Sequence, residues 1–406
     1  METIRVRKLN HANLHITCES GTAQELNEFF SFYVPGYKFM PAFRSRMWDG
    51  KIRLFSIMSG EFPAGLYPHL LQFAEQREYE VVCDDSRYGK PDDHNKIDVK
   101  ELYEYIKNLK IPYEIRDYQF DAVSTGIHRK RGVLLSPTGS GKSLIIYVLA
   151  RYWIERLTTG YKYPKGGRVL IIVPTTSLVE QMYKDFTDYG WDVEKYCHRV
   201  YSGRSKSTQQ RVTISTWQSI YKLEKSWYSD FDVVVGDEAH LFKSKSLIDI
   251  MTKLLDCKYR FGFTGTLDGT QTHKWILEGL FGPSYNVTKT KELIEKGHVS
   301  KLDIKILLLK HSSQKFNTYE EEIQYLIGHP KRNNFIKNLA LDLKGNTLVL
   351  FSRVESHGQP LYESINNAFF QGIGLILATK LASQLDFFMV MFWALFYVTV
   401  HNINFN

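Results

Sequence analysis

The stretch "VLLSPTGSGKSLIIYVLA", from Val133 to Ala150, combines an apolar strand, a turn of small residues and an apolar helix. A loop that binds phosphate needs small residues, so that its backbone N–H groups can point at the anion, and a helix N-terminus beneath it. The turn ends in Gly141-Lys142-Ser143, which offers a lysine for the β- and γ-phosphates and a hydroxyl for Mg²⁺. This order of strand, loop and helix predicts a nucleotide-binding loop, although Ser136 stands where the general pattern has glycine.

A phosphate loop leaves the function open, because kinases, GTPases and motor proteins all contain one and some matches arise by chance. The chain has 406 residues, enough for about two or three domains. Its net charge of +8 and pI of about 9.0 are a weak indication of a polyanionic partner. Its four cysteines include no C-x-x-C pair, and the N-terminal segment lacks a signal-peptide pattern. We therefore expect no zinc site of the usual spacing, and a protein of the cytoplasm, or of the host cytoplasm if the source is a virus.

The hydrophobic pattern predicts an α/β protein with several parts. Residues 1–88 contain short strands and helices, as in a small α+β domain, and residues 89–110 form a polar, turn-rich linker. In residues 111–300, apolar strands alternate with helices, which is typical of a parallel sheet covered on both faces. Residues 301–369 continue with a further apolar strand, and residues 370–406 form an atypical apolar tail.

Two local patterns in the front domain predict specific features. Thr22 and Glu25 have capping-box spacing ahead of the apolar helix "AQELNEFFSFYV". Asp49-Gly50 stands between two strand-like runs in "FRSRMWDGKIRLFS", which predicts a β-hairpin.

Between Gly36 and Arg53, basic residues outnumber acidic ones and alternate with aromatic residues. The basic residues are Lys38, Arg44, Arg46, Lys51 and Arg53, against Asp49 as the acidic one, and the aromatic residues are Tyr37, Phe39, Phe43 and Trp48. Basic side chains bind phosphates and aromatic rings stack on bases, so this segment is a candidate DNA-binding surface. The alternative is a hairpin whose aromatic side chains form the domain's own core. Both interpretations can hold, because alternate residues of a strand face opposite sides.

Polar residues follow the predicted strands of residues 111–300 at the ends where ligands of parallel sheets bind. Asp237 and Glu238 end the strand in "FDVVVGDEAHLF" and suit Mg²⁺ binding and the orientation of a water molecule. Thr264 and Thr266 follow the next strand, where their hydroxyls could sense the γ-phosphate or simply form a turn. Gln119 precedes the helix before the phosphate loop, and its amide could pair with adenine.

The order of these motifs resembles that of superfamily 2 helicases. The segments "RDYQ", "SPTGSGKS", "IIVPTTSLVEQ", "ISTWQS", "DEAH" and "FTGT" are similar to the Q motif and motifs I, Ia, Ib/Ic, II and III of that superfamily. There the first motif often begins with Ala or Ser, so Ser136 fits it. The resemblance implies that residues 111–300 form a RecA-like ATP-binding lobe and that residues 301–369 begin a second one.

The front segment "FFSFYVPGYKFMPAFRSRMWDGKIRLFS" is similar to the UvsW family of phage helicases, as is "VESHG" at Val354 to Gly358. This resemblance implies ATP-dependent, DEAH-box helicase activity with ATP and Mg²⁺ as cofactors. It also implies DNA as the partner, in branched or forked form, and RNA–DNA hybrids, during phage replication, recombination and repair. A membrane is not an expected partner.

The resemblance also assigns residues to roles. For the adenine and the phosphates it implies Arg116, Gln119, Pro137, Thr138, Gly139, Ser140, Gly141, Lys142 and Ser143. For catalysis it implies Lys142, Asp237, Glu238 and His240, with Ser143 and Asp237 serving Mg²⁺, and for coupling Thr264, Gly265 and Thr266. For nucleic acid it implies Pro174, Thr175, Thr176, Ser215, Thr216 and Trp217, to which the front segment adds Arg44, Arg46 and Lys51 as candidates. Trp217, beside an apolar strand, could equally be a core residue.

The last third departs from the helicase pattern. "NTLVLFSRVESHG" predicts an apolar strand and a polar turn, but no Q-x-x-G-R-x-x-R segment follows to supply an arginine across the ATP cleft. The run from Phe387 to Val400 is uniformly apolar but shorter than the ~20 residues of a membrane span. A buried helix or strand pair, a membrane anchor and an interrupted reading frame are the alternatives, and we favour the last.

This gap leaves three functional alternatives. The first is a UvsW-type helicase, the second is a truncated nucleotide-dependent DNA-binding protein with little turnover, and the third is a restriction-type translocase subunit. Without the arginine, we expect this chain to bind ATP and DNA but to hydrolyse ATP slowly.

Overall fold

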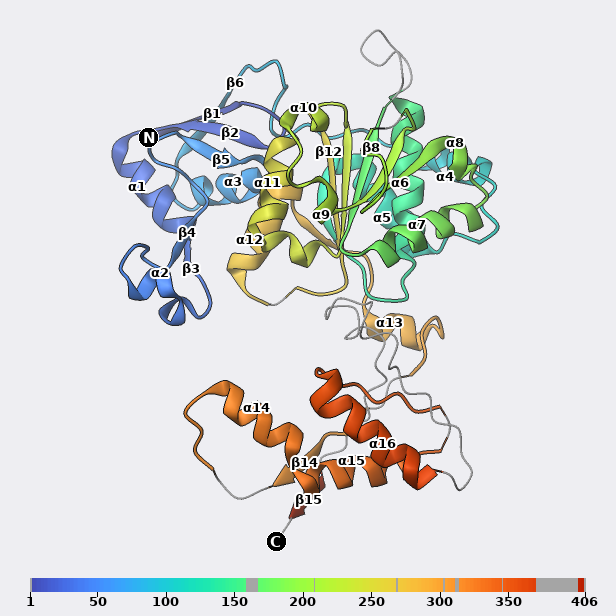
Figure 1. Ribbon diagram of the computed structural model, residues 1–406. Helices are drawn as coiled ribbons and strands as arrows, with labels where there is room; N and C mark the ends of the chain where they lie inside the picture. The colour runs from blue at the N-terminus through green and yellow to red at the C-terminus, as the bar shows by residue number, and fades with distance from the viewer. Residues whose placement is uncertain are drawn as a thin grey trace. The chain divides into compact units, whose positions relative to one another are not determined.

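The structure is a computed structural model that describes residues 2–157, 167–207, 209–267, 269–301, 304–310, 314–344, 346–369 and 401–404. It divides into two compact units, Met1–Val299 and Ser300–Asn406, each described by itself (Figure 1).

The first unit begins with a four-stranded sheet in the order β5-β2-β1-β6. Its strands are β1 (Thr3–Lys8), β2 (Asn13–Thr17), β5 (Glu61–Pro63) and β6 (Glu80–Asp84), and its helices are α1 (Ser20–Phe29), η2 (Ala64–Leu66) and α3 (Tyr67–Glu75). Every second residue of β1 is buried, so that Ile4 and Val6 join Phe30, Phe62 and Phe73 in one apolar core. The predicted small α+β domain at the front of the chain is confirmed.

The predicted capping box of the front domain is wrong. Helix α1 begins at Ser20, ahead of Thr22, and its N-terminal flanking residue Glu19 makes no capping hydrogen bond through its side chain. The Thr22 hydroxyl instead donates to the Glu2 carboxylate, because Thr22 lies within the helix on its buried side.

The predicted hairpin at Asp49-Gly50 is also wrong in its pairing. Strand β4 (Lys51–Arg53) follows Gly50 as expected, but its antiparallel partner is β3 (Ser31–Tyr33). The run before Asp49 contains helices η1 (Tyr37–Phe39) and α2 (Pro41–Arg44) instead of a strand. Pro41 explains this difference, because proline favours the first turn of a helix and cannot donate a hydrogen bond in a strand ladder.

A seven-stranded sheet dominates the rest of the first unit, in the order β13-β7-β12-β11-β8-β10-β9, and all its pairings are parallel. Its strands are β7 (Arg131–Leu135), β8 (Val169–Val173), β9 (Cys197–Val200), β10 (Val212–Thr216), β11 (Val233–Asp237), β12 (Tyr259–Thr264) and β13 (Ser284–Asn286). Strands β7, β8, β10, β11 and β12 are the apolar strands expected in residues 111–300, which is thus confirmed, and β9 and β13 add an edge strand on each side.

Helices cover both faces of this sheet (Figure 1). On one face the core includes side chains of α4 (Val99–Asn108), α5 (Asp117–Arg129), α6 (Lys142–Arg156), α7 (Thr176–Asp188) and α8 (Val193–Tyr196). On the other it includes side chains of α9 (Trp217–Ile220), α10 (Lys225–Tyr228), η3 (Ala239–Lys243), α11 (Lys245–Lys253) and α12 (Gln271–Phe281). Val169 and Ile171 join the first core and Leu170 and Ile172 the second, which explains why the strands are apolar throughout. Helix α13 (Thr290–Glu295) follows β13.

Helix α12 also belongs to the core of the front domain. Its Trp275 packs against Phe30 and Phe32, with ring centroids 5.1 and 5.0 Å apart. The backbone of Gly65 comes so close to this helix that an added Cβ would lie 1.9 Å from the Glu278 carbonyl oxygen. The front sheet and the seven-stranded sheet are therefore packed together through α12.

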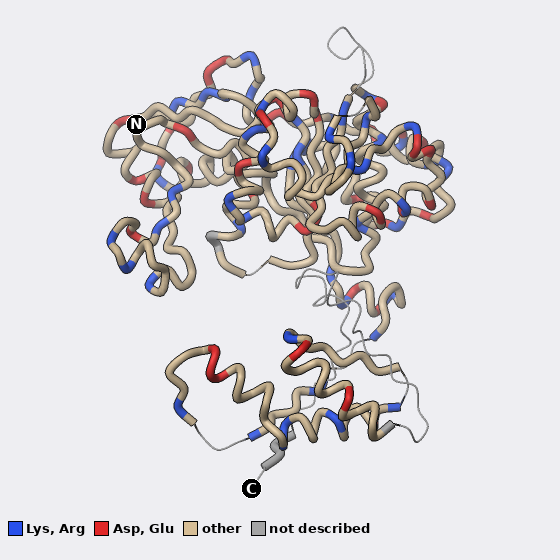
Figure 2. Tube along the Cα trace, viewed as in Figure 1, with Lys and Arg blue, Asp and Glu red and all other residues tan. Residues whose placement is uncertain are grey.

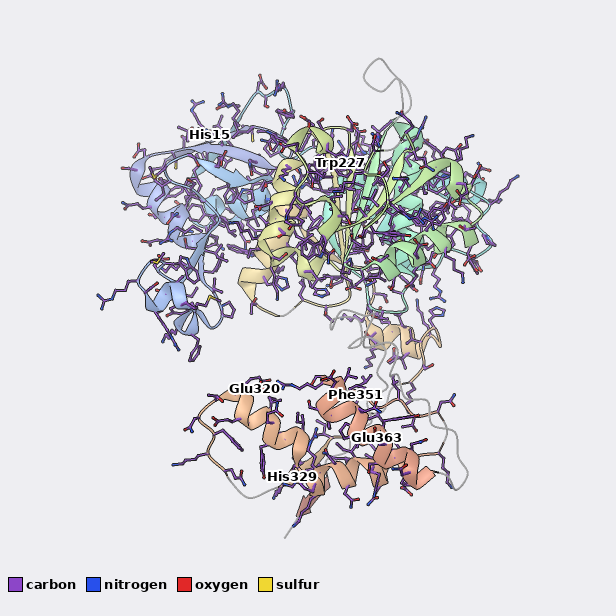
Figure 3. All side chains as sticks on the ribbon, viewed as in Figure 1. His15, Trp227, Glu320, His329, Phe351 and Glu363 are labelled. Atoms are coloured by element: carbon purple, nitrogen blue, oxygen red, sulfur yellow. The ribbon has the colours of Figure 1, made fainter. Side chains whose placement is uncertain are left out.

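The second unit contains α14 (Tyr319–Gly328), α15 (Pro330–Asp342), η4 (Val354–Gly358) and α16 (Gln359–Phe369), with β14 (Leu307–Lys310) paired in parallel to β15 (His401–Asn404). Glu320 and Phe351 are labelled in Figure 3. Glu320 accepts two hydrogen bonds of 2.7 Å from Arg353. The ring of Phe351 lies against Gly358, where an added Cβ would meet it at 2.2 Å.

The strand predicted in "NTLVLF" is wrong: residues 346–353 form no strand, and "VESHG" is a π-helical turn that leads into α16. Within the described part of the second unit, β14 pairs with β15. The apolar run from Phe387 to Val400 lies outside the described residues. Among the helices that the structure describes, none combines the length and apolar character that a membrane span requires.

Candidate ATP-binding and catalytic site

The predicted phosphate loop connects β7 to α6, and two of its glycines adopt backbone conformations that other residues rarely adopt. Gly139 and Gly141 have φ angles of 81° and 79°, in the left-handed region that suits glycine. A Cβ on Gly141 would also lie 2.3 Å from Gln119 Nε2. Inside the loop, Ser136 Oγ lies 2.6 Å from Ser140 Oγ, which donates to the Pro137 carbonyl oxygen at 2.6 Å. Ser136, which stands where the general pattern has glycine, therefore stabilises the loop through its contact with Ser140. Thr138 and Gly139 are exposed.

Two side chains at the start of α5 form hydrogen bonds with the backbone of the phosphate loop. Gln119 Nε2 and Tyr118 Oη donate to the Ser140 carbonyl oxygen at 2.8 and 3.1 Å. Gln119 Oε1 accepts from the Arg116 backbone N–H at 3.0 Å, and Arg116 Nη1 donates to Tyr118 Oη at 2.8 Å. Gln119 is only 4 % exposed, so both ends of its amide support the loop from within the protein.

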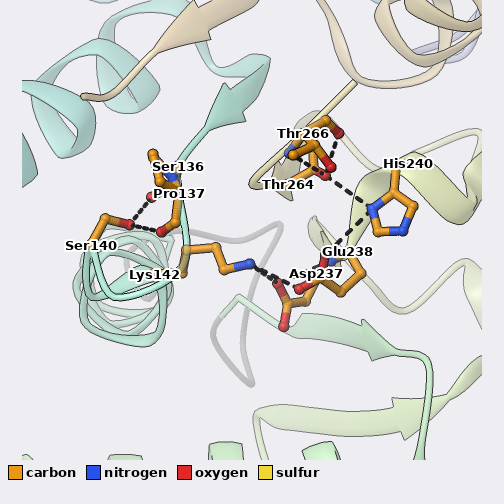
Figure 4. Close-up of polar contacts among 9 residues, drawn as sticks. All are labelled: Ser136, Pro137, Ser140, Lys142, Asp237, Glu238, His240, Thr264 and Thr266. Atoms are coloured by element: carbon orange, nitrogen blue, oxygen red, sulfur yellow. Dashed lines mark hydrogen bonds and ion pairs between the residues drawn. The ribbon is translucent and has the colours of Figure 1, made fainter. Parts of the chain in front are cut away.

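Lys142, on the first turn of α6, reaches the carboxylates at the end of β11 (Figure 4). Its Nζ donates to Glu238 Oε1 at 2.9 Å and lies 4.0 Å from Asp237 Oδ1. Burial would lower the pKa of Lys142, but the charges of Asp237 and Glu238 outweigh it and raise that pKa. The lysine is therefore held positively charged, facing the carboxylates across the loop.

The two carboxylates differ in environment. Burial raises the pKa of Asp237, the charge of Glu238 adds to this, and Lys142 opposes it. For Glu238, burial acts in the same direction, but the nearby His240 and the charge of Lys142 outweigh it and lower the pKa. Glu238 adopts a left-handed backbone, with φ and ψ of 51°, a conformation that costs about 1–3 kcal/mol outside glycine and is frequent at functional sites.

His240 connects the Glu238 carboxylate to the end of the neighbouring strand β12 (Figure 4). His240 Nδ1 lies 3.3 Å from Glu238 Oε2 and 3.0 Å from Thr264 Oγ1. Thr264 Oγ1 donates to the Thr266 carbonyl oxygen at 2.9 Å, and the Thr264 carbonyl oxygen accepts from the Ser136 backbone N–H at 2.8 Å. Thus the loop, the "DEAH" segment and the "FTGT" segment form one connected polar network, with Gly265 beside the backbone of Pro137.

His273 extends this network and was not predicted from the sequence. Its Nε2 lies 2.9 Å from the His240 carbonyl oxygen, and the residue is 4 % exposed. Because His273 lies on α12, the same helix that carries Trp275 into the front core, the network leads from the carboxylates at the end of β11 to the front domain. No local motif marks His273, since its role comes from a partner 33 residues away.

The predicted Mg²⁺ ligands offer the oxygen atoms that this ion prefers. Asp237 is 7 % exposed and its charge is only partly offset by Lys142, so a divalent cation beside it would relieve the cost of burying the carboxylate. Ser143 Oγ, on the first turn of α6, lies 2.7 Å from Tyr189 Oη. The donor set therefore fits a magnesium ion.

The predicted nucleic-acid residues of the lobe fall into two groups. Thr175 caps the N-terminus of α7, where its hydroxyl accepts from the Leu178 backbone N–H at 3.4 Å. Thr176 beside it is exposed, and Pro174 is half-buried. Ser215 and Thr216 are buried at the end of β10: Ser215 Oγ donates to carbonyl oxygens at 2.9 and 3.2 Å, and Thr216 Oγ1 lies 2.8 Å from Ser219 Oγ.

Trp217, the next predicted nucleic-acid residue, is half-buried and packs against the second core, with its ring 5.9 Å from that of Tyr221. In this arrangement Thr176 presents its side chain to solvent, whereas those of Ser215 and Thr216 do not reach the surface.

The front loop between β3 and β4 contains several basic residues (Figure 2). Arg44 and Arg46 are exposed, while Lys51 is half-buried with its Nζ 4.9 Å from the centre of the Tyr33 ring. A hollow of about 580 Å³ lies among seven residues of this loop: Lys38, Phe43, Arg44, Arg46, Met47, Trp48 and Asp49. The structure therefore keeps Arg44 and Arg46 on the surface. The alternative that the aromatic side chains of this segment form the domain's own core is wrong: none of them joins that core, and Phe39 is 77 % exposed.

The fold and this site define a P-loop ATPase of helicase superfamily 2. Residues 3–84 match the family "DNA helicase UvsW, N-terminal", and residues 112–269 match the family "Type III restriction enzyme, res subunit". The chain is 34 % identical over 383 residues to the ATP-dependent DNA helicase uvsW of Enterobacteria phage T4, covering 90 % of this chain and 74 % of that protein. It belongs to the UvsW family, and its activity is that of an ATP-dependent DNA helicase.

Solved structures agree with this assignment. Two crystal structures of UvsW from bacteriophage T4 superpose with TM-scores of 0.61 and 0.62, at 34 % and 32 % identity. The first match covers 70 % of this chain and 99 % of that one, and the second covers 91 % and 73 %. The DNA 3'-5' translocase XPB2 of Sulfurisphaera tokodaii is 26 % identical over 212 residues, 52 % of this chain and 44 % of that protein. The family predicted from the sequence motifs is confirmed, and the two alternative functions are not favoured.

Proposed function

We propose that this protein uses ATP and Mg²⁺ to remodel branched or forked DNA, and that RNA–DNA hybrids are a second substrate. The observation that carries the proposal is the network of Lys142, Glu238, His240 and Thr264 at the carboxyl ends of adjacent parallel strands. The similarity to a phage helicase supports a role in phage replication and recombination, in the cytoplasm of the infected host.

Each residue of the network has a role that its geometry supports. Lys142 binds the β- and γ-phosphates, because its buried ammonium is held charged at the end of the phosphate loop. Glu238 orients the attacking water, since its carboxylate is kept ionised and aimed by an uncommon backbone conformation. His240 and Thr264 hold Glu238 in place and relay changes at the γ-phosphate to the rest of the lobe.

Ser143 and Asp237 would hold the magnesium ion, which supplies charge neutralisation on the phosphates when bound. Tyr118 and Gln119 fix the position of the loop backbone by donating hydrogen bonds to the Ser140 carbonyl oxygen. With Arg116, they also mark the side of the loop where we place the adenine. Phosphoryl transfer needs this positioning more than it needs covalent chemistry.

We place the nucleic acid along Pro174, Thr175, Thr176 and Trp217 on the lobe. The front loop, with Arg44, Arg46 and Lys51, provides a second contact to the phosphate backbone. The exposed arginines support this placement, because phosphate contacts supply most of the affinity of proteins for DNA. Ser215 and Thr216 would act from within β10 by fixing the backbone that presents Trp217.

Fluorescence anisotropy with labelled nucleic acids tests the substrate class. Forked DNA, linear duplex and an RNA–DNA hybrid of equal length are compared at one salt concentration. We expect forked DNA to bind at least about tenfold more tightly than linear duplex, and the hybrid to bind more tightly than linear duplex. Equal affinity for all three would contradict the proposed substrate class, while leaving the ATP site untouched.

A further inference from the structure

A cavity of about 320 Å³ lies at the edge of the seven-stranded sheet that is opposite the phosphate loop. Arg131 at the start of β7, Lys258 just before β12 and Pro283 just before β13 contribute to its wall. Because all these strands are parallel, their amino ends share this edge, whereas the ATP site lies at their carboxyl ends. The front domain closes the cavity with Lys8 and His11.

The lining of this cavity carries a surplus of positive charge. Its basic residues are Lys8, Arg129, Lys130, Arg131 and Lys258, and its acidic residues are Asp92 and Asp93. Asp93 is shared between two lysines, with Lys130 Nζ at 2.6 Å and Lys258 Nζ at 2.9 Å. Asp92 pairs with His94 at 2.6 Å. The carboxylates of the lining are thus already engaged, and among the described residues Lys8, Arg129 and Arg131 of the lining form no ion pair with a carboxylate.

Lys8 is the most unusual member of this group. It is 7 % exposed, and its Nζ donates to the Lys90 carbonyl oxygen at 3.4 Å. Within the described residues, no carboxylate forms an ion pair with it. Burial, together with the charges of Arg131 and Lys258, lowers the pKa of Lys8 to about 8, and the charge of Asp93 opposes this shift only in part. A buried ammonium without a counter-charge is costly, and proteins usually retain one only where something anionic meets it.

The guanidinium group of Arg131 also forms its hydrogen bonds with uncharged partners. Its nitrogen atoms donate to the carbonyl oxygens of Phe281, His11 and Leu280 at 3.0, 3.3 and 3.4 Å. These bonds fix the orientation of the guanidinium but leave its charge unbalanced. Arg260, fully buried nearby, also donates hydrogen bonds to carbonyl oxygens, among them those of Cys257 and Met251.

We propose that this cavity is a binding site for a phosphate group, separate from the ATP site. A phosphate carries close to two negative charges at neutral pH, which matches the surplus of the lining better than a carboxylate does. Arginine and lysine side chains are the usual phosphate ligands. The phosphate can come from a small free anion or from a nucleic-acid backbone. Since the lining joins the front domain to the lobe, the bound group would also strengthen the contact between them.

Isothermal titration with inorganic pyrophosphate tests the site. The experiment uses the full chain with Lys142→Ala, so that the ATP site contributes little to phosphate binding. We expect saturable binding that Lys8→Met weakens at least about tenfold, because it removes the buried ammonium. Lys100→Met, on the exposed face of α4, is the matched control and should leave the affinity unchanged.

A second variant keeps the result interpretable if Lys8→Met alters folding. Lys258→Met removes a partly exposed cation of the same lining, and it should also weaken binding by at least about threefold. A single-stranded oligonucleotide added as competitor then identifies the source of the phosphate. Displacement of pyrophosphate supports a nucleic-acid backbone, and continued binding supports a small free anion. Absence of pyrophosphate binding, or binding that neither substitution weakens, would overturn the proposal.

Discussion

Lys142 Nζ lies 2.9 Å from Glu238 Oε1, although the two residues are 96 positions apart in the chain. The sheet brings them together, because β7 and β11 are both parallel strands that end at the same edge. The contact joins the residue that we expect to bind the phosphates to the residue that we expect to orient the water. It is the core of the proposed site.

Lys142→Ala should weaken the binding of ATP with Mg²⁺ by at least about tenfold. The substitution removes the point charge at the end of the phosphate loop, and charge-assisted hydrogen bonds are worth about twice as much as neutral ones. Calorimetry with a non-hydrolysable ATP analogue measures the effect. Equal affinities of the wild type and the variant would show that the loop does not bind the triphosphate.

Arg44→Ala, Arg46→Ala and Lys51→Ala, combined in one chain, should weaken DNA binding and its dependence on salt. Each lost phosphate contact lowers the slope of log affinity against log salt by up to about 0.9. A variant with Lys100, Lys107 and Lys110 changed to alanine has the same net charge and serves as the control, because these lysines are exposed on or beside α4. If both triple variants show the same slope, the front loop is not a specific DNA contact.

Gly65→Ala should lower the free energy of unfolding by about 1–3 kcal/mol, the usual cost of overpacking. An added Cβ would lie 1.9 Å from the Glu278 carbonyl oxygen, so the front domain and α12 would have to move apart. Urea denaturation measures the change. Gly21→Ala is the control: nothing lies within 4 Å of its added Cβ, and alanine within α1 should stabilise by about 0.5–1 kcal/mol. Equal stability of the two variants would mean that the contact through α12 is loose.

The sequence contains no Q-x-x-G-R-x-x-R segment. An arginine that contacts the γ-phosphate contributes ~10³–10⁵ in rate in related P-loop enzymes. We therefore expect the purified chain to bind ATP well but to turn it over slowly at saturating DNA. Steady-state hydrolysis as fast as several turnovers per second would show that another residue supplies this charge.

The sequence predicted those parts of the site that depend on local rules. Lys142, Asp237 and Glu238 follow apolar strands, and ligands of parallel sheets bind at strand ends, so their proximity could be inferred. The burial of Ser215 and Thr216 could not be inferred from the sequence, because it depends on which strands flank β10. His273 and Lys8 were missed for the same reason: each meets its partners only through packing between distant segments.

Local patterns also failed where tertiary structure decided the outcome. Asp49-Gly50 has a strong hairpin signal, yet Pro41 starts a helix and the strand pairs with the more distant Ser31–Tyr33. Thr22 and Glu25 have the spacing of a capping box, yet α1 begins at Ser20. In both cases the competing partner lies outside the motif: Ser31–Tyr33 for the strand and Glu2 for Thr22.

Release of labelled phosphate from ATP in the presence of DNA, compared between the wild type and Glu238→Gln, tests the central claim most directly, and it remains measurable when turnover is slow. Glutamine preserves the shape of the side chain and, with Lys142 intact, should leave ATP affinity within about threefold, which calorimetry verifies. We predict that the rate falls at least about 10²-fold, the usual contribution of a residue that orients or activates the attacking group. An unchanged rate in Glu238→Gln, with ATP still bound, would contradict the assignment of this network as the site of ATP hydrolysis.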